Sequence, residues 1–215
     1  MIYSIAKFFQ RLTLKLFSKW TINGIEHVPP IGGVIIVANH VSEFDPPLLA
    51  STFDRKIKFL AKSGIFSGFF QRWFLKEYGA FPVKRGVVDR SAYLWILEQL
   101  ELGNAVVVFP EGTRSMKGMR KGKSGVARIA LHSKSPILPV GIIGTKNMGK
   151  WTRVFYPSGK IQVNIGRVFN LPDIEGHLNH QLLESMSEMI MERIAELLPN
   201  EYRGYYSSTN LKENS

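Results

Sequence analysis

Two short apolar runs constrain the fold of this chain most strongly, because each leads directly into a polar segment. Residues 33–38 read GVIIVA and residues 105–110 read AVVVFP, and both are rich in β-branched side chains. Runs of this length and composition predict buried strands. Because α/β sheets bind ligands at the C-terminal ends of their strands, the polar residues after each run are the first candidates for a functional site.

The rest of the chain alternates between predicted strands and helices. Further strands are expected at residues 57–61, 137–143 and 160–167, with Pro139 indicating an edge position or a bulge. Helices are expected at residues 1–20, 46–53, 65–78, 91–102, 125–132 and 178–198. This alternation predicts a single α/β domain with a mixed, mostly parallel sheet flanked by helices.

The 215 residues suit one domain. We expect one globular domain over residues 21–200, preceded by an amphipathic membrane-associating helix over residues 1–20. Residues 201–215 are polar and are expected to form a mobile tail.

The charge of the chain is strongly segregated. Its 28 lysines and arginines against 17 aspartates and glutamates give a net charge of +11. Four of the bases lie in residues 1–20 and twelve in residues 112–172, and neither stretch contains an acid. Such segregation predicts a polarised surface that meets nucleic acid, an anionic membrane, or an acidic protein or phosphorylated substrate. The absence of cysteine excludes a disulfide scaffold, a cysteine zinc site and a thiolate nucleophile.

The first 20 residues have the pattern of an interfacial helix. Lys7, Arg11, Lys15 and Lys19 fall within one arc of a helical wheel, and apolar side chains fill most of the rest. The alternative is a terminal helix packed on the core with solvated lysines. The sequence contains no run of 18 apolar residues and no uninterrupted apolar segment of a signal peptide. We therefore expect a peripheral or monotopic protein on the cytoplasmic side of a membrane.

A histidine and an aspartate follow the first apolar run, in the segment NHVSEFD at residues 39–45. Pro46 disfavours helical conformation at Asp45, so a turn is expected between the two side chains. A turn can return the carboxylate to one nitrogen of His40, which leaves the other nitrogen to accept a proton. The alternative is that Asp45 only caps the next helix and that His40 is an ordinary loop residue.

The second apolar run leads into the segment FPEGTRS at residues 109–115. Arg114 can bind a phosphate through two N–H groups, Gly112 permits close backbone approach, and Glu111 can accept a hydrogen bond from a hydroxyl. The alternative is an ordinary turn with a surface Glu–Arg pair. Two more cations are candidates for binding an anion, although each alone is typical of a solvated surface: Lys62 and Arg85.

Two other sites are not supported by the sequence. Residues 118–124, GMRKGKS, are similar to a phosphate-binding P-loop but have three residues between the glycines instead of four. No G-x-S-x-G motif is present, so a serine nucleophile on a strand-to-helix elbow is not expected.

Together, the motifs resemble those of the glycerolipid acyltransferase family, in particular its 1-acylglycerol-3-phosphate (lysophosphatidate) acyltransferases. NHVSEFD matches the first, HX4D block of the family and FPEGTRS matches the third in full. Gly79-x-Phe81-x-x-x-Arg85 resembles the second block, LPV at residues 138–140 the fourth, and GKSGVAR at residues 122–128 is similar to bacterial members. The chain departs from the family in being short and in having PVK at residues 82–84.

The resemblance implies transfer of a fatty acyl group from an acyl thioester, acyl-CoA or acyl-carrier protein, to the free hydroxyl of 1-acylglycerol-3-phosphate. Because a thioester is already activated, the enzyme need only deprotonate the hydroxyl and hold it in line. His40 is implied as the general base and Asp45 as its orienting partner. The residues expected to bind substrate are Lys62, Arg85, Glu111, Gly112, Thr113 and Arg114. The resemblance implies that Glu111 holds the glycerol of the acceptor and that the cations Lys62, Arg85 and Arg114 bind its phosphate. No cofactor, metal ion or nucleic acid is expected.

Two questions stay open at this level. The aromatic side chains at Phe66, Phe69, Phe70, Trp73 and Phe74 have helical spacing and are expected to pack in the core, with a lipid-facing or acyl-binding surface as the alternative. The acceptor could be another lysolipid, such as lyso-ornithine lipid, another lysophospholipid or a glycolipid. A non-catalytic basic protein that binds membrane or nucleic acid would explain the charge, but not the two motifs that follow strands.

Overall fold

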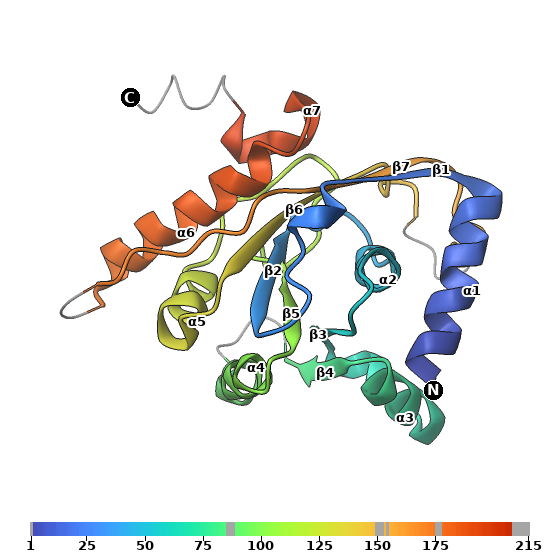
Figure 1. Ribbon diagram of the computed structural model, residues 1–215, viewed down its shortest axis with the longest axis horizontal. Helices are drawn as coiled ribbons and strands as arrows, with labels where there is room; N and C mark the ends of the chain where they lie inside the picture. The colour runs from blue at the N-terminus through green and yellow to red at the C-terminus, as the bar shows by residue number, and fades with distance from the viewer. Residues whose placement is uncertain (1, 85–88, 149–152, 154, 175–177, 208–215) are drawn as a thin grey trace.

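A seven-stranded sheet divides the computed structural model into two layers of helices (Figure 1). The structure describes residues 2–84, 89–148, 153, 155–174 and 178–207. The strands are β1 (Ser18–Asn23), β2 (Val34–Ala38), β3 (Ile57–Lys62), β4 (Ala80–Val83), β5 (Ala105–Val108), β6 (Ile137–Ile143) and β7 (Gly159–Ile165). Their order across the sheet is β1-β7-β6-β2-β5-β3-β4, and β7 runs antiparallel to β6 while the other neighbours pair in parallel. The predicted α/β domain with a mixed, mostly parallel sheet is confirmed.

The helices cover both faces of this sheet. They are α1 (Ile2–Phe17), α2 (Asp45–Thr52), α3 (Phe69–Glu77), α4 (Arg90–Glu101), α5 (Gly125–Ser133), α6 (His180–Ala195) and α7 (Asn200–Arg203), with short 3-10 turns η1 (Ile25–His27), η2 (Ser63–Phe66) and η4 (Gly204–Tyr206). In Figure 1, α1, α2 and α3 lie on one side of the sheet and α4, α5 and α6 on the other.

The central strand β2 explains why both layers hold. Its five residues are all buried, and successive side chains of a strand point to opposite faces. Val34, Ile36 and Ala38 join the apolar cluster under α1 and α2, whereas Ile35 and Val37 join the cluster under α4, α5 and α6. This is why the sequence of the strand is a continuous apolar run and not an alternating one.

The expected helix over residues 1–20 is too long. The helix α1 ends at Phe17, and residues 18–23 form the edge strand β1, which the sequence pattern did not predict. Ser18 pairs with Gly159 and Asn23 with Asn164 in a parallel ladder. The partner strand lies far along the chain, so the local pattern contains no trace of this pairing.

Pro139 lies in an inner strand, because β6 has β2 on one side and β7 on the other. The edge position that its sequence suggested is therefore wrong, but the alternative of a bulge is close to what is seen. Val140 pairs with Ile165, and Ile137 forms a bridge with Phe169. The advance of three residues from Ile137 to Val140 therefore lies opposite an advance of four residues from Ile165 to Phe169. This extra residue interrupts the ladder at Pro139, which has no N–H to donate.

The helix expected over residues 65–78 is divided into η2 and α3. Phe66 is buried and Phe74 packs against the core, as expected for an aromatic stripe of helical spacing. The expectation is wrong for the other three aromatic residues, because Phe69, Phe70 and Trp73 are 92%, 69% and 46% exposed. Three of the five aromatic side chains of the stripe are therefore exposed.

The expected mobile tail is also wrong over its first part. Residues 200–206 form α7 and η4, and Tyr202 and Tyr206 are buried. Backbone hydrogen bonds join Met119 to Tyr202 and to Tyr205, so this segment packs on the loop between β5 and α5. Residues 208–215 lie outside the part of the chain that the structure describes.

Candidate active site

The two motifs meet because the strands that precede them are neighbours. The strands β2 and β5 pair in parallel, with Val37 opposite Val108, so both chains leave the sheet at the same edge. The strand β6 runs parallel to β2 on its other side, with Ala38 opposite Val140. Segments 39–45, 109–115 and 144–148 are thus brought together although up to about 100 residues separate them in the sequence.

The carboxylate of Asp45 is the best-connected group at this edge. It is fully buried, and its Oδ2 accepts hydrogen bonds from the backbone N–H groups of Val41 (2.7 Å) and Ser42 (2.8 Å) and from the ring of His40 (2.9 Å). Its Oδ1 accepts the hydroxyl of Thr145 at 2.8 Å. Four donors hold the carboxylate in one position, which is what a buried charge requires.

The imidazole of His40 is oriented by this carboxylate. Because an ionised carboxylate only accepts hydrogen bonds, the ring nitrogen Nδ1 carries the proton, and Nε2 presents its lone pair. The ring is stacked on Phe109 with centroids 4.1 Å apart, and the residue is 6% exposed. This is the geometry of a general base: one nitrogen is fixed by an acid and the other is available to remove a proton.

The alternative of Asp45 as a simple helix cap is not what the structure has. The helix α2 begins at Asp45 itself, so the N-cap position is occupied by Phe44, whose side chain cannot accept a hydrogen bond from the helix. The carboxylate instead bonds backward to the turn that precedes the helix. Asp45 therefore closes the turn that carries His40.

Glu111 links the two motifs. Its Oε1 accepts the backbone N–H of His40 at 2.9 Å and its Oε2 accepts that of Arg120, also at 2.9 Å. The side chain is 3% exposed, and this burial raises the pKa of Glu111 to about 7, against the opposing effect of the two hydrogen bonds. A direct bond to an acceptor glycerol, which the resemblance implies, would need the second lone pair of one of these oxygens.

The other residues of the FPEGTRS segment line its turn. Gly112 has a φ of +69°, a backbone conformation that favours glycine, and the nearest atoms to a Cβ at this position would be those at the flexible end of the Lys123 side chain. Thr113 is half-buried. Arg114 is partly exposed and donates to the carboxylate of Glu43 at 2.6 Å, within the HX4D turn.

Of the two more distant cations, Lys62 and Arg85, the structure describes only Lys62. Lys62 is the last residue of β3 and is exposed at the same edge of the sheet. Since β5 lies between β3 and β2, this strand end is roughly 10 Å from that of β2. Arg85 lies outside the described residues.

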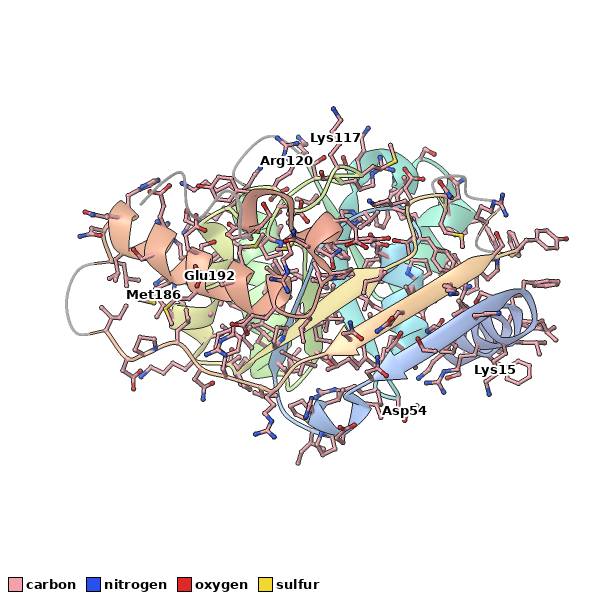
Figure 2. All side chains as sticks on the ribbon, turned by 90° about the horizontal axis from the view of Figure 1, so that it is seen from above. Lys15, Asp54, Lys117, Arg120, Met186 and Glu192 are labelled. Atoms are coloured by element: carbon pink, nitrogen blue, oxygen red, sulfur yellow. The ribbon has the colours of Figure 1, made fainter. Side chains whose placement is uncertain are left out.

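The loop between β5 and α5 contributes much of the positive charge at this edge. Figure 2 shows Lys117 and Arg120 projecting from the same side of the molecule. Lys121, in contrast, lies 3.7 Å from Glu184 and 3.9 Å from Glu188 of α6. Part of the acid-free stretch is therefore neutralised by the acidic C-terminal helix, and part remains open to an anionic partner.

Thr145 is a buried polar residue at this edge that none of the sequence motifs predicts. It stands two residues after β6, so the same rule that singled out the ends of β2 and β5 would have found it. Among the residues that the structure describes, no group of three histidine, aspartate or glutamate side chains is placed to hold a metal ion.

The buried Glu111 carboxyl should make the folded protein less stable as the pH rises. An unfolded chain loses this proton near the ordinary value of 4.5, whereas the folded carboxyl keeps it to about pH 7. Between these values the folded state binds more protons, so the free energy of unfolding falls with rising pH, by roughly 3 kcal/mol in all. Urea unfolding at several pH values measures the decrease.

A side chain that does not ionise should remove this part of the pH dependence. We expect Glu111→Gln to give a flatter profile between about pH 5 and pH 7, and the exposed Glu98→Gln on α4 to keep the wild-type slope. A Glu111→Gln profile as steep as that of the wild type would contradict the raised pKa.

Known proteins are similar to this chain in sequence. A family model described as Acyltransferase matches residues 19–143. The 1-acyl-sn-glycerol-3-phosphate acyltransferase of Bacillus subtilis is 29% identical over 173 residues, which cover 80% of this chain and 84% of that protein. The protein of the same name from Streptococcus pneumoniae is 26% identical over 187 residues, covering 83% and 68%.

A solved structure is also similar. The crystal structure of the 1-acyl-sn-glycerophosphate (LPA) acyltransferase PlsC from Thermotoga maritima matches 91% of this chain and 79% of its own, with a TM-score of 0.69 and 28% identity. The family model alone covers more than half of the 215 residues. The chain therefore belongs to the acyltransferase family, as its HX4D and FPEGTRS motifs predict.

Proposed function

We propose that this protein transfers a fatty acyl group from an acyl thioester, acyl-CoA or acyl-carrier protein, to the free hydroxyl of 1-acylglycerol-3-phosphate and so forms phosphatidate. The observation that carries the proposal is the His40–Asp45 pair, buried at the edge of the sheet next to the FPEGTRS turn. The names of the relatives from Bacillus subtilis and Streptococcus pneumoniae support the choice of acceptor.

In this proposal His40 acts as the general base. Its Nε2 removes the proton of the acceptor hydroxyl as the oxygen attacks the thioester carbonyl, and Asp45 stabilises the imidazolium that forms. The tetrahedral intermediate collapses with cleavage of the C–S bond, and the proton on Nε2 passes to the leaving thiolate. No covalent acyl-enzyme is needed, which suits a chain without cysteine.

The acceptor phosphate needs cations near this base. Arg114 lies on the turn next to His40, and its pair with Glu43 is partly exposed, so a phosphate dianion can replace the carboxylate at little cost. We assign the phosphate to Arg114 first, with Lys62 and Arg85 as further cations. Gly112 and Thr113 shape the turn that presents Arg114, and Glu111 holds that turn against His40.

A second part of the proposal is that the protein docks on a membrane through α1 and α3. The apolar face of α1 is turned outward: Ile5, Phe8, Phe9, Leu12, Leu16 and Phe17 are all exposed, between 42% and 65%. The helix α3 lies on the same side of the sheet (Figure 1) and exposes Phe69, Phe70 and Trp73. An exposed surface made of this many large apolar side chains is typical of a membrane or protein contact.

The orientation of α1 turns two of the four cations on its basic arc, Lys7 and Arg11, toward the protein. Lys7 donates to the carbonyl groups of Phe53 and Asp54, and Arg11 to that of Ser51 and to the carboxylate of Asp54. These cations therefore stabilise the C-terminal end of α2, where carbonyl groups lack helical partners. Figure 2 shows Lys15 and Asp54 on the same side of the molecule as α1.

Within the part of the chain that the structure describes, no helix is long and apolar enough to cross a membrane. We propose the cytoplasmic surface of the membrane, because the acyl thioester donors are soluble molecules and the lysolipid acceptor is membrane-bound.

Replacing the base should remove the activity and leave the fold intact. We expect His40→Ala to lower kcat with 1-acylglycerol-3-phosphate and acyl-CoA or acyl-carrier protein by about 100-fold or more, since a general base contributes about that much. The exposed His180→Ala on α6 serves as the matched control and should keep wild-type rates. Acyl transfer at an undiminished rate by folded His40→Ala would refute the assignment.

Removing Arg114 should weaken binding of the acceptor more than it slows the chemical step. We expect Arg114→Ala to raise the acceptor KM by about tenfold with a smaller change in kcat, because one charge-assisted contact to phosphate is lost. A monoacylglycerol acceptor lacks the phosphate, so any slow reaction with it should be insensitive to the substitution. Equal effects on both acceptors would assign Arg114 to the turn rather than to the phosphate.

Polar residues in the exposed apolar surface should weaken membrane binding. We expect Phe8→Ser with Phe9→Ser, or Phe69→Ser with Phe70→Ser, to weaken binding to anionic liposomes in a flotation assay by about 100-fold or more, since each buried phenyl group contributes roughly 1.5–3 kcal/mol and each variant removes two. Leu94→Ser on α4 is the control, because Leu94 is 51% exposed on the opposite face of the sheet. Undiminished flotation of both double variants would exclude this docking surface.

A further inference from the structure

Thr145 stands outside every motif that identifies the family, yet it contacts the catalytic pair. The side chain is fully buried, and its hydroxyl donates to Oδ1 of Asp45 at 2.8 Å. This hydroxyl is a neutral donor from a strand end that is 100 residues away in the sequence. The other three donors to Asp45 come from the HX4D turn itself.

The chain around Thr145 is shaped to direct this hydroxyl inward. Gly144 has a φ of +91°, and a Cβ atom there would lie 1.9 Å from the carbonyl oxygen of Lys160 on β7, so only glycine fits. The N–H of Gly144 donates to the hydroxyl of Tyr202 at 3.0 Å. The carbonyl of Thr145 accepts the N–H of Met148 at 2.9 Å, which closes a turn. Three separate segments therefore fix the position of one threonine.

The contact completes the support of the carboxylate. The three donors from the HX4D turn all bind Oδ2, so they hold one oxygen and leave rotation of the carboxylate plane to other contacts. Thr145 holds the second oxygen from the opposite side, at the end of β6. With both oxygens bound, the direction in which Oδ2 accepts the ring proton of His40 is set by β2 and β6 together.

We propose that Thr145 is a positioning residue for the His40–Asp45 pair: its hydroxyl fixes the plane of the Asp45 carboxylate and thereby the direction in which the His40 ring presents Nε2 to the acceptor. The expected effect of Thr145 on catalysis rests on the proposed function, whereas its expected effect on the orientation of the His40 imidazole does not. The other groups facing the ring or its backbone are Phe109 on the ring face and Glu111 at the backbone N–H.

The test compares variants that differ by the hydroxyl alone. Thr145→Val keeps the branched shape and loses the donor, whereas Thr145→Ser keeps the donor. Thr52→Val is the matched control, because Thr52 is 1% exposed and its hydroxyl donates to the carbonyl of Leu48 within α2. Urea unfolding establishes that each variant folds, and the two valine variants should lose similar stability.

Kinetics provide the first measurement. We expect Thr145→Val to lower kcat by about tenfold with little change in the acceptor KM, since a hydroxyl bond to a charged group is lost outside the substrate site. Thr145→Ser should restore most of the rate, and Thr52→Val should be as active as the wild type. Wild-type kcat in folded Thr145→Val, or no recovery in Thr145→Ser, overturns the proposal.

The second measurement needs no substrate. The Nδ1 proton of His40, bound to Asp45, should give a low-field NMR signal in the wild type, in Thr145→Ser and in Thr52→Val, and this signal should broaden or exchange faster in Thr145→Val. An unchanged signal in Thr145→Val overturns the positioning role even if the rate falls. If the signal depends on Thr145 and the wild type transfers no acyl group to 1-acylglycerol-3-phosphate, the positioning role stands and the proposed function fails.

Discussion

The site depends on one buried negative charge. Asp45 has no exposed surface, so its carboxylate is tolerable only because four donors surround it. Those donors come from the turn after β2 and from the end of β6, and the same edge receives Glu111 from the end of β5. The parallel strands thus provide more than a core, because their fixed spacing and direction bring three distant segments within hydrogen-bonding distance.

Glu111 illustrates a conflict between stability and site geometry. Its carboxylate joins the backbone of His40 to that of Arg120, which fixes the two motifs relative to each other. The same burial raises its pKa to about 7, so the ionised form costs stability near neutral pH. Such a cost is common where a polar group serves the arrangement of a site and not the strength of the core.

The first helix shows how a charge pattern can have two meanings. A cationic arc beside a broad apolar face is typical of a helix lying on anionic lipid. In the folded chain, Lys7 and Arg11 instead bind the C-terminal carbonyl groups of α2 and the side chain of Asp54. The apolar face is left outside, next to the exposed aromatic residues of α3. We still expect a membrane contact. It would be made by the exposed apolar face of α1 and not by Lys7 and Arg11.

Local features could be predicted from the amino-acid sequence alone: the strand runs at residues 34–38 and 105–108, the turn between His40 and Asp45, and the family that these motifs indicate. They could be predicted because strand propensity and turn formation depend on residues within a few positions of each other. Long-range packing sets the pairing of β1 with β7, the inward orientation of Lys7 and the contact between Thr145 and Asp45. Each of these joins residues at least 40 positions apart, and such partners are chosen by sheet order and packing, which no local pattern records.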